Sequence, residues 1–218
     1  MTTLLAKSLP KKLPSKSIPD TESSMSDFVD PYIDQETGIL RNLLGAKTWK
    51  ELQRAEADII SVSQIALANI PRTNNLSELK TIHKALFGKI YDWAGQLRTV
   101  DIRKGSEEYF LSFTEFDTGT TYVFEELRKE NYLKGLDQKE FVNKLAYFYE
   151  QLNFIHPFRE GNGRTQRVFW SRVAKDAGYI INWKDVVGDE LDKASQIGRE
   201  QNNIKPLIEM FDRIVSHA

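Results

Sequence analysis

The sequence predicts a mostly α-helical domain with one small β-hairpin. Along most of the chain, apolar residues recur three or four positions apart, which is the spacing of one helix face. Only residues 97–113 show the alternation of apolar and polar residues that is typical of strands. The chain has 218 residues, 40% of them hydrophobic, so it is long enough for one domain with a packed core.

Residues 1–28 differ from the rest of the chain because they are rich in Lys, Ser and Pro. Their only apolar patch is shorter than the hydrophobic region of a signal peptide. We interpret residues 1–28 as a flexible leader and residues 29–218 as the folded domain. The alternative is a leader that folds on another molecule. Turn residues at Asp30-Pro31 and Thr37-Gly38 mark a polar stretch at the start of the domain.

Two helices are predicted in the first half of the domain. The first spans residues 47–70 and is ended by Pro71. Its expected core face consists of Trp49, Leu52, Ala55, Ile59 and Val62. Ser77 begins the second helix, whose apolar side consists of Leu79, Ile82, Leu86 and Ile90. His83 borders this apolar side, which favours a structural role for it.

Residues 97–113 are expected to form the hairpin, or an extended flap. Val100 and Ile102 alternate with polar residues, and Lys104-Gly105-Ser106 is typical of a turn. This is the only strand candidate in the chain. Arg98 and Arg103 flank the alternating residues. They are candidates for contact with a ligand or a target, and a plain exposed position is the alternative.

The second half of the domain is predicted to be helical. Thr114 with Asp117 resembles a capping box and begins a helix that ends near Gly135. Asp137 with Glu140 begins another, which continues to His156. A further helix spans residues 164–178, where Gly178 is a C′ glycine. Shorter helices are expected over residues 188–200 and 204–215.

Composition excludes several classes of function. The net charge is −1, so the chain has no basic surface of the kind that binds nucleic acid. There is no cysteine, which excludes disulfides and thiolate zinc sites and fits a reducing compartment such as the cytoplasm. The sequence contains no apolar run long enough to span a membrane.

The most informative stretch is HPFREGNGRTQR, residues 156–167. Gly161, Asn162 and Gly163 are residue types that tolerate positive φ, so their N–H groups can turn inward to form an anion nest. The nest lies where a helix N-terminus adds positive charge. Arg164 and Arg167 share one face of that helix and reach the same anion. This much positive charge suits a di- or triphosphate.

Two further side chains of this stretch add chemistry to the nest. Glu160 adjoins it, and a carboxylate beside a polyphosphate requires a cation such as Mg²⁺ between them. His156 is the one side chain of the stretch that can take up a proton at neutral pH. The site contains no nucleophile, so a second substrate must bring a hydroxyl group.

A P-loop is excluded because no Gly-Lys-Ser/Thr follows the glycines, and a zinc site lacks further ligands. A plain connecting loop is the structural alternative, but the whole set of residues favours a nucleotide site.

The stretch resembles the signature of the Fic family, HPFx(D/E)GNGRxxR, at every position. The segments DPYIDQETGILRNLLG and IYDWAGQLRTVDIRKG extend the resemblance to roughly residues 29–215. It implies a helical Fic fold and an enzyme that transfers AMP from ATP to a Tyr, Thr or Ser hydroxyl of a target protein. By position, His156 would deprotonate the hydroxyl and Glu160 would hold Mg²⁺. The phosphates would be bound by Gly161, Asn162, Gly163, Arg164 and Arg167.

The resemblance also implies how the target is held and which group is transferred. A flap would pair with the target in the manner of a strand, through Thr99, Val100, Asp101, Ile102, Lys104 and Gly105. The kinase-like Doc branch carries Lys where this chain has Gly163, so Gly163 favours AMP transfer. Transfer of UMP and removal of AMP are the alternatives at the same site.

Regulation and partners follow from the same resemblance. Fic enzymes are commonly restrained by a (S/T)xxxE(G/N) helix whose Glu pairs with the inner arginine, here Arg167. Only Thr121 and Glu125 have this spacing, and Glu126 follows them in place of Gly or Asn. We therefore expect a bacterial toxin restrained by a small antitoxin in trans, with gyrase B or topoisomerase IV subunits as implied targets. A secreted, host-directed effector fragment or a docking module is the alternative.

Overall fold

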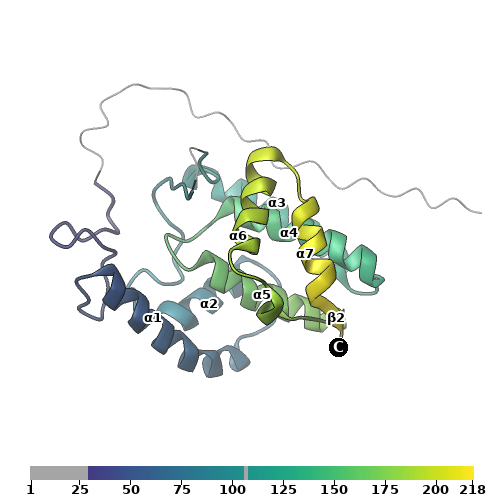
Figure 1. Cartoon of the computed structure of the whole chain (residues 1–218), viewed down its shortest axis with the longest axis horizontal. Helices are drawn as coiled ribbons and strands as arrows, with labels where there is room; N and C mark the ends of the chain where they lie inside the picture. The colour runs from purple at the N-terminus through teal and green to yellow at the C-terminus, as the bar shows by residue number, and fades with distance from the viewer. Residues whose placement is uncertain (1–28, 106–107) are drawn as a thin grey trace, which may run out of the picture.

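The computed structural model describes residues 29–105 and 108–218, and most of them are helical (Figure 1). The expected leader, residues 1–28, lies outside the described residues. The α-helices are α1 (Trp49–Ser63), α2 (Leu76–Phe87), α3 (Phe116–Lys129), α4 (Gln138–Ile155), α5 (Asn162–Asp176), α6 (Glu190–Gln201) and α7 (Lys205–Ile214). The 3₁₀ turns are η1 (Gln64–Asn69), η2 (Phe113–Glu115), η3 (Asn131–Leu133) and η4 (Trp183–Asp185). Within the described ranges, no helix is long and apolar enough to cross a membrane.

Helix α4 is the central element of the domain. It packs against α3, α5, α6 and α7, and every residue from Leu145 to Ile155 is buried. The side chain of Asp137 caps its first turn by accepting a hydrogen bond from the Glu140 amide at 2.8 Å. A helix surrounded on all sides needs apolar residues around its whole circumference, which α4 has in its second half. Its C-terminus therefore places His156 inside the domain.

Helix α1 covers the edge of the domain next to α2, and its buried stripe is narrower than the sequence predicts. Leu52 is buried, but Trp49 and Val62 are 47% and 60% exposed, so the expected core face is wrong at both ends. The buried positions are Leu52, Glu56 and Ser63. The stripe thus includes a carboxylate, which a count of apolar residues cannot identify.

Two of the three helix caps differ from the sequence prediction. Helix α2 is capped by Asn75, whose side chain accepts from the amides of Ser77 and Glu78. The predicted capping box at Thr114 does not form, because α3 begins at Phe116 without a side-chain cap. Thr114 instead bonds to the Ser112 hydroxyl at 3.1 Å. The η2 turn that precedes α3 supplies the helix entry.

A mostly α fold is confirmed, but the regular strands lie elsewhere than expected. Strand β1 (Tyr179–Ile181) pairs antiparallel with β2 (Val215–His217), with Ile181 opposite Val215. Gly178, at φ +89°, turns the chain out of α5 into β1. The described part of residues 97–113 contains one isolated antiparallel bridge, between Arg103 and Tyr109. The prediction of this segment as the only strand candidate is therefore wrong.

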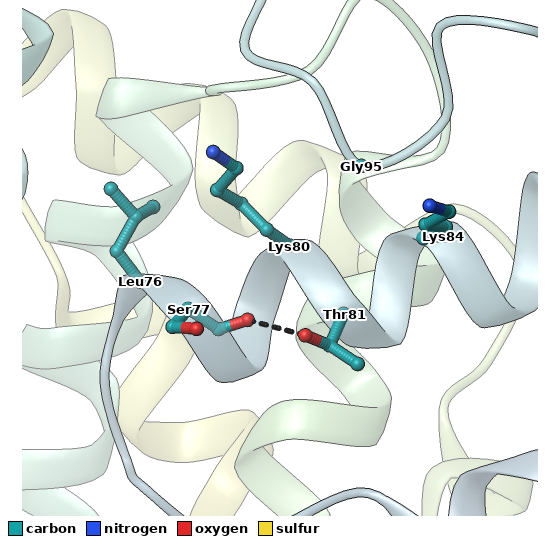
Figure 2. Close-up of a pocket in the computed structure, with 6 residues that line it drawn as sticks. All are labelled: Leu76, Ser77, Lys80, Thr81, Lys84 and Gly95. Carbon is teal, nitrogen blue, oxygen red and sulfur yellow. Dashed lines mark hydrogen bonds between the residues drawn. The ribbon is translucent and has the colours of Figure 1, made fainter.

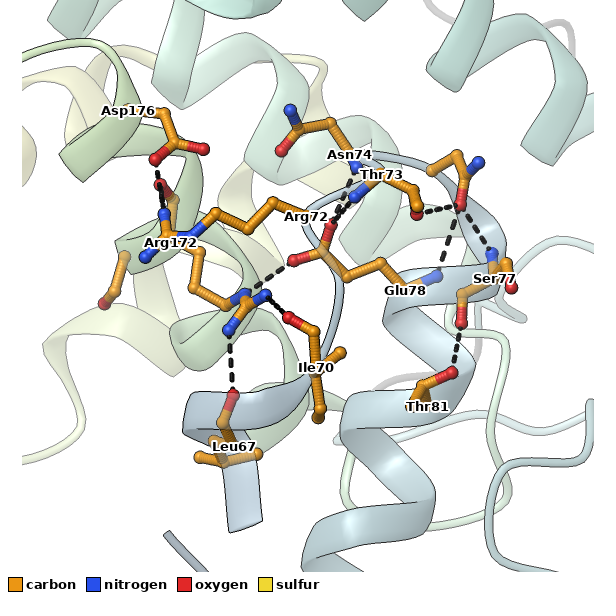
Figure 3. Close-up of polar contacts among 12 residues, drawn as sticks. Leu67, Ile70, Arg72, Thr73, Asn74, Ser77, Glu78, Thr81, Arg172 and Asp176 are labelled. Atoms are coloured by element: carbon orange, nitrogen blue, oxygen red, sulfur yellow. Dashed lines mark hydrogen bonds and ion pairs between the residues drawn. The ribbon is translucent and has the colours of Figure 1, made fainter. Parts of the chain in front are cut away.

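A polar cluster anchors α5 to the loop before α2 (Figure 3). Arg172 of α5 donates to Glu78 Oε1 at 2.6 Å and to the carbonyls of Leu67 and Ile70. The other oxygen of Glu78 accepts from the Thr73 and Asn74 amides, each at 2.7 Å. The pair is buried and every oxygen is satisfied, so it fixes α5 relative to α2. The cluster therefore supports the packing of α5 against α2.

Candidate active site

The signature stretch forms the turn from α4 into α5. His156 is the C-cap of α4 in the left-handed conformation, with φ 47°, and Gly161 precedes α5 with φ 81°. Helix α5 begins at Asn162, two residues earlier than the predicted start. Asn162 closes the turn: its side-chain oxygen accepts from the Phe158 amide at 2.9 Å and its amide donates to the Phe158 carbonyl at 2.7 Å. Its buried side chain thus shapes the loop, and direct contact with a nucleotide stays a prediction.

Gly161 cannot be replaced without disturbing the loop. A Cβ atom built on it would lie 2.4 Å from the Phe87 ring, and its φ is one that side chains rarely adopt. Gly163 differs, because a Cβ there meets no atom within 4 Å. Contact with Phe87 therefore explains why position 161 is a glycine. The absence of a side chain at Gly163 leaves open space beside the first turn of α5.

The imidazole of His156 is half-buried and held in one tautomer. Nδ1 lies 3.2 Å from the Asn153 carbonyl oxygen, which can only accept, so Nδ1 carries the proton and Nε2 has a free lone pair. Burial, together with the nearby charges of Arg98, Lys104 and Arg199, lowers the pKa of His156 to about 3. The ring is consequently neutral at physiological pH and has Nε2 available as a proton acceptor.

The carboxylate of Glu160 is partly exposed and held through one oxygen. Oε1 accepts from the Gly161 amide at 2.8 Å and from Arg164 Nη2 at 3.1 Å. Among the described contacts, none engages Oε2. Hard oxygen ligands suit Mg²⁺, which proteins commonly bind through one carboxylate together with substrate phosphates. No group of three or more His, Cys, Asp or Glu side chains gathers in the described part of the chain, so Glu160 would need those phosphate oxygens to hold the ion.

The two signature arginines have different surroundings. Arg164 forms ion pairs with Glu56 of α1 at 2.7 Å and with Glu160, and its guanidinium lies 4.7 Å from the centre of the Phe87 ring. Arg167 is exposed and its guanidinium lies 5.8 Å from the centre of the Trp183 ring. No carboxylate within residues 29–105 and 108–218 pairs with Arg167. It is the arginine of the two that is open to an incoming anion.

His83 supports the turn between α4 and α5, in agreement with the structural role that the sequence favoured. Its Nδ1 accepts from the Gly95 amide at 2.8 Å, so Nε2 carries the proton and donates to the Glu160 carbonyl at 2.9 Å. The ring is fully buried and stacks on Phe158 with centroids 3.9 Å apart. Burial lowers its pKa to about 4. The neutral imidazole of His83 therefore holds the backbone of Glu160 in place.

The flap residues lie beside His156 and are tied to the domain at both ends. The Thr99 amide donates to the Tyr32 hydroxyl at 3.1 Å, and Asp101 accepts from the Phe113 amide at 2.9 Å. The carbonyls of Lys104 and Gly105 accept from Arg199 and Gln196 of α6, each at 3.3 Å. Val100 is buried, whereas Ile102 is partly exposed and Lys104 and Gly105 are exposed. The flap can therefore present Lys104 and Gly105 to a target, with Val100 as its anchor.

Arg98 is structural, contrary to one of the interpretations of the sequence. It is 2% exposed, and its Nε donates to the His156 carbonyl at 2.9 Å. Other N–H groups of the same guanidinium donate to the carbonyls of Val100, Leu111 and Ile155. It therefore ties the end of α4 to the flap. Arg103, in contrast, lies exposed over the Tyr109 ring, with its guanidinium 5.6 Å from the ring centre.

Two residues, Glu56 and Phe110, contribute to the site although the sequence did not predict them there. Glu56 follows Leu52 by four positions on α1, so its helical spacing placed it on the buried face, but its charge argued against burial. Phe110 stacks on the His156 ring and is buried, yet it lies in a segment whose pairing the sequence left open. The signal for Phe110 was an apolar run, Tyr109 to Leu111, that the alternation of the flap does not explain.

A shallow cavity of about 400 Å³ opens on the outer face of α2. Figure 2 shows Lys80, Lys84 and Gly95 around it, with the Thr81 hydroxyl bonded back to the Ser77 carbonyl at 2.8 Å. None of the signature residues lines this cavity. It is therefore separate from the candidate active site.

The family model of the Fic/DOC family matches residues 73–174. The chain is 41% identical over 168 residues to the protein adenylyltransferase VbhT of Bartonella schoenbuchensis, covering 76% of this chain and 35% of VbhT, so it spans about a third of that relative. It is 34% identical to the probable protein adenylyltransferase Fic of Escherichia coli, over 87% of this chain and 94% of that protein.

Solved structures resemble the fold over most of the chain. The BepC effector protein of Bartonella tribocorum, crystallised with bound AMPPNP, superimposes with a TM-score of 0.81 at 25% identity, covering 86% of this chain and 97% of that one. The N-terminal Fic domain of a Bartonella quintana effector, with bound ADP, gives a TM-score of 0.80 at 27% identity, covering 85% and 94%. The expected Fic fold is thereby confirmed.

Proposed function

Because the chain belongs to the Fic/DOC family, we propose that it is a protein adenylyltransferase, which transfers AMP from ATP to a Tyr, Thr or Ser hydroxyl of a target protein. Relatives that it matches over nearly the whole of both chains carry that name. Structural neighbours with bound AMPPNP and ADP support ATP as the nucleotide.

The observation that carries the proposal is a neutral histidine at the start of the turn that leads into the N-terminus of α5. His156 Nε2 has a free lone pair because Nδ1 donates to the Asn153 carbonyl. The target hydroxyl gives its proton to Nε2 while its oxygen attacks the α-phosphorus, and pyrophosphate leaves. His156 does not need to form a covalent bond, which fits a site without a nucleophile of its own.

The other signature residues would neutralise the phosphates. Mg²⁺ supplies charge compensation when bound, and Glu160 Oε2 is the oxygen that is open to it. The backbone of Gly161 to Gly163, at the N-terminus of α5, faces the phosphate chain, and Arg167 binds its β/γ side. The glycine at position 163, where the Doc branch has Lys, supports transfer of AMP in preference to the γ-phosphate.

The flap would align the target. Lys104 and Gly105 are exposed, and Ile102 is partly exposed beside the bridge of Arg103 with Tyr109. An extended segment of the target that bonds to this edge would bring its hydroxyl toward His156. Thr99, Val100 and Asp101 would act by holding the edge in place.

A separate antitoxin would restrain the enzyme through Arg167. Glu125, the one glutamate with the expected Thr spacing, pairs with Arg128 on an exposed face of α3 at 2.7 Å, so it does not serve this role. An acidic side chain from another protein fits Arg167, as the toxin–antitoxin interpretation requires. Gyrase B and topoisomerase IV subunits remain the proposed targets. The structural likeness to translocated effector proteins of Bartonella supports a second candidate, a host-directed effector.

The proposal is tested with purified protein, Mg²⁺, a bacterial lysate and ATP labelled at the α-phosphorus. We expect a labelled protein band whose mass increases by one AMP, and mass spectrometry of that band identifies the target. Parallel reactions with labelled UTP and with γ-labelled ATP separate UMP and phosphate transfer from AMP transfer. Labelling of a protein in a host-cell lysate, with none labelled in the bacterial lysate, would favour the host-directed effector.

A further inference from the structure

We propose that Glu56 of α1 is a positioning residue for the metal-binding carboxylate: it holds Arg164 in place, and Arg164 in turn orients Glu160. The inference rests on the proposed function, which assigns Glu160 to Mg²⁺. Glu56 lies outside the stretch that the family model matches, residues 73–174, so the signature by itself does not include it.

Glu56 is a buried carboxylate, with a side chain that is 9% exposed. Burial of an unpaired carboxylate is strongly unfavourable, so its partners must compensate for the lost hydration. Both of its oxygens have such partners. Oε2 accepts from Arg164 Nη1 at 2.7 Å, and Oε1 accepts from the Tyr91 hydroxyl. Burial raises the pKa of Tyr91, so this hydroxyl keeps its proton and remains a donor.

Arg164 connects this buried pair to the metal ligand. Its Nη1 faces Glu56 and its Nη2 donates to Glu160 Oε1 at 3.1 Å. Its guanidinium also lies 4.7 Å from the centre of the Phe87 ring, which limits its movement. One positive charge is thus shared between two carboxylates, one on α1 and one in the turn before α5, that lie 104 positions apart in the sequence.

The division of Arg164 between two carboxylates determines whether an oxygen of Glu160 remains available to a cation. While Glu56 occupies Nη1, Arg164 bonds to one oxygen of Glu160 and leaves Oε2 open. Without the charge of Glu56, Arg164 can turn its full fork toward Glu160 and pair with both oxygens. Such a pair competes directly with Mg²⁺ for the same carboxylate. Removal of the charge of Glu56 should therefore weaken the binding of Mg²⁺ without changing any group that contacts the ion.

The test is the Glu56→Gln variant, which keeps the shape of the side chain and removes its charge. The melting temperature of the protein is measured with a non-hydrolysable ATP analogue while Mg²⁺ is titrated, and AMP transfer is followed over the same titration. We expect the Mg²⁺ concentration that gives half of the stabilisation to rise about 10-fold, which is a typical loss when a partner of a metal ligand is removed. Transfer at saturating Mg²⁺ should change much less.

The matched control is Asp58→Asn, which makes the same change of charge at an exposed position of the same helix. Its Mg²⁺ midpoint should equal that of the unmodified protein. If Glu56→Gln does not fold, Glu56→Asp keeps the charge but withdraws it from Arg164 by one methylene, and a smaller rise of the midpoint is expected.

A lower melting temperature with an unchanged Mg²⁺ midpoint, in whichever of the two variants folds, would overturn the proposal, because Glu56 would then only stabilise α1. Analogue binding by the unmodified protein that does not depend on Mg²⁺ would overturn it as well. Failure of the proposed function has a different signature: the unmodified protein would bind the analogue with Mg²⁺ but label no target.

Discussion

The imidazole ring of His156 lies flat against the phenyl ring of Phe110, with ring centroids 3.8 Å apart and ring planes inclined by 13°. Phe110 is 3% exposed, and the Arg199 guanidinium lies 4.7 Å from its ring centre. The proposed base is therefore packed against the returning arm of the flap and, through it, against α6. This contact accounts for part of the burial that keeps the imidazole neutral.

We expect Phe110→Ala to raise the pKa of His156 from about 3 toward the ordinary value of about 6.5. Removal of the phenyl ring lets water reach the imidazole, and hydration favours its charged form. The chain has three histidines, so the titration can be followed by NMR of the ring protons. Phe113→Ala, at an exposed position of the same segment, should leave the pKa of His156 unchanged. An equal shift in both variants would refute the role of the stack.

Gly161 and Gly163 form a matched pair for a stability test. Gly161→Ala should lower the free energy of unfolding by about 2–5 kcal/mol, because the methyl group overlaps the Phe87 ring and the backbone is left-handed. Gly163→Ala should leave it unchanged or raise it by up to about 1 kcal/mol, since alanine favours the helix. Urea unfolding followed by circular dichroism gives both values. Similar losses in the two variants would show that contact with Phe87 does not determine the conformation of the turn at Gly161.

His83 predicts a dependence of stability on pH. Its pKa is lowered to about 4 in the folded protein and is about 6.5 when unfolded, so below pH 6.5 the unfolded chain binds a proton that the folded protein does not. The contribution of His83 to stability is constant above that pH, falls by up to about 1.4 kcal/mol per pH unit below it, and levels off near pH 4.

His83→Gln keeps a donor for the Glu160 carbonyl but cannot take up the proton. Between pH 7 and 5, its unfolding free energy should decline less steeply than that of the unmodified protein, by about one bound proton. Chemical unfolding at several pH values measures the two slopes. Parallel slopes would mean that His83 is protonated in the folded state, contrary to its bond from the Gly95 amide.

Local features of the sequence were sufficient to predict the parts that depend on near neighbours. The α4 helix with its Asp137 cap, Gly178 after α5 and the order of residues in the signature were all predictable. Each depends on contacts within a few positions of the chain. The apolar residues around His83 on α2 also favoured a structural role, although its bonds to Gly95 and Glu160 connect it to distant parts of the chain.

The remainder depends on partners that are distant in the sequence. Glu56 is buried because Arg164 and Tyr91 reach it from other elements, and no spacing on α1 indicates that pairing. Arg98 is buried because carbonyls from α4 and from residue 111 converge on it. Strands β1 and β2 are too short to show a pattern of their own and form only because α7 brings Val215 beside Ile181.

Arg167→Ala should weaken binding of ATP with Mg²⁺ by roughly 10- to 100-fold, the usual range for loss of a charge-assisted hydrogen bond to phosphate. Arg167 has no acidic partner within the described residues, so its removal leaves no buried charge and the fold should persist. Lys175→Ala removes a charge from an exposed position of the same helix and is the control. Calorimetric titration measures both, and an affinity equal to that of the control would exclude Arg167 from the nucleotide site.

Transfer of α-labelled AMP by the His156→Ala variant tests the account most directly. The unmodified protein and the variant are incubated with labelled ATP, Mg²⁺ and the lysate in which the target is found, and nucleotide binding is measured on the same preparations. We expect transfer to fall by at least about 100-fold, because a general base contributes about that much. Nucleotide affinity should stay within a few-fold. Transfer that persists at the unmodified rate, or affinity lost together with transfer, would contradict the assignment of His156 as the base.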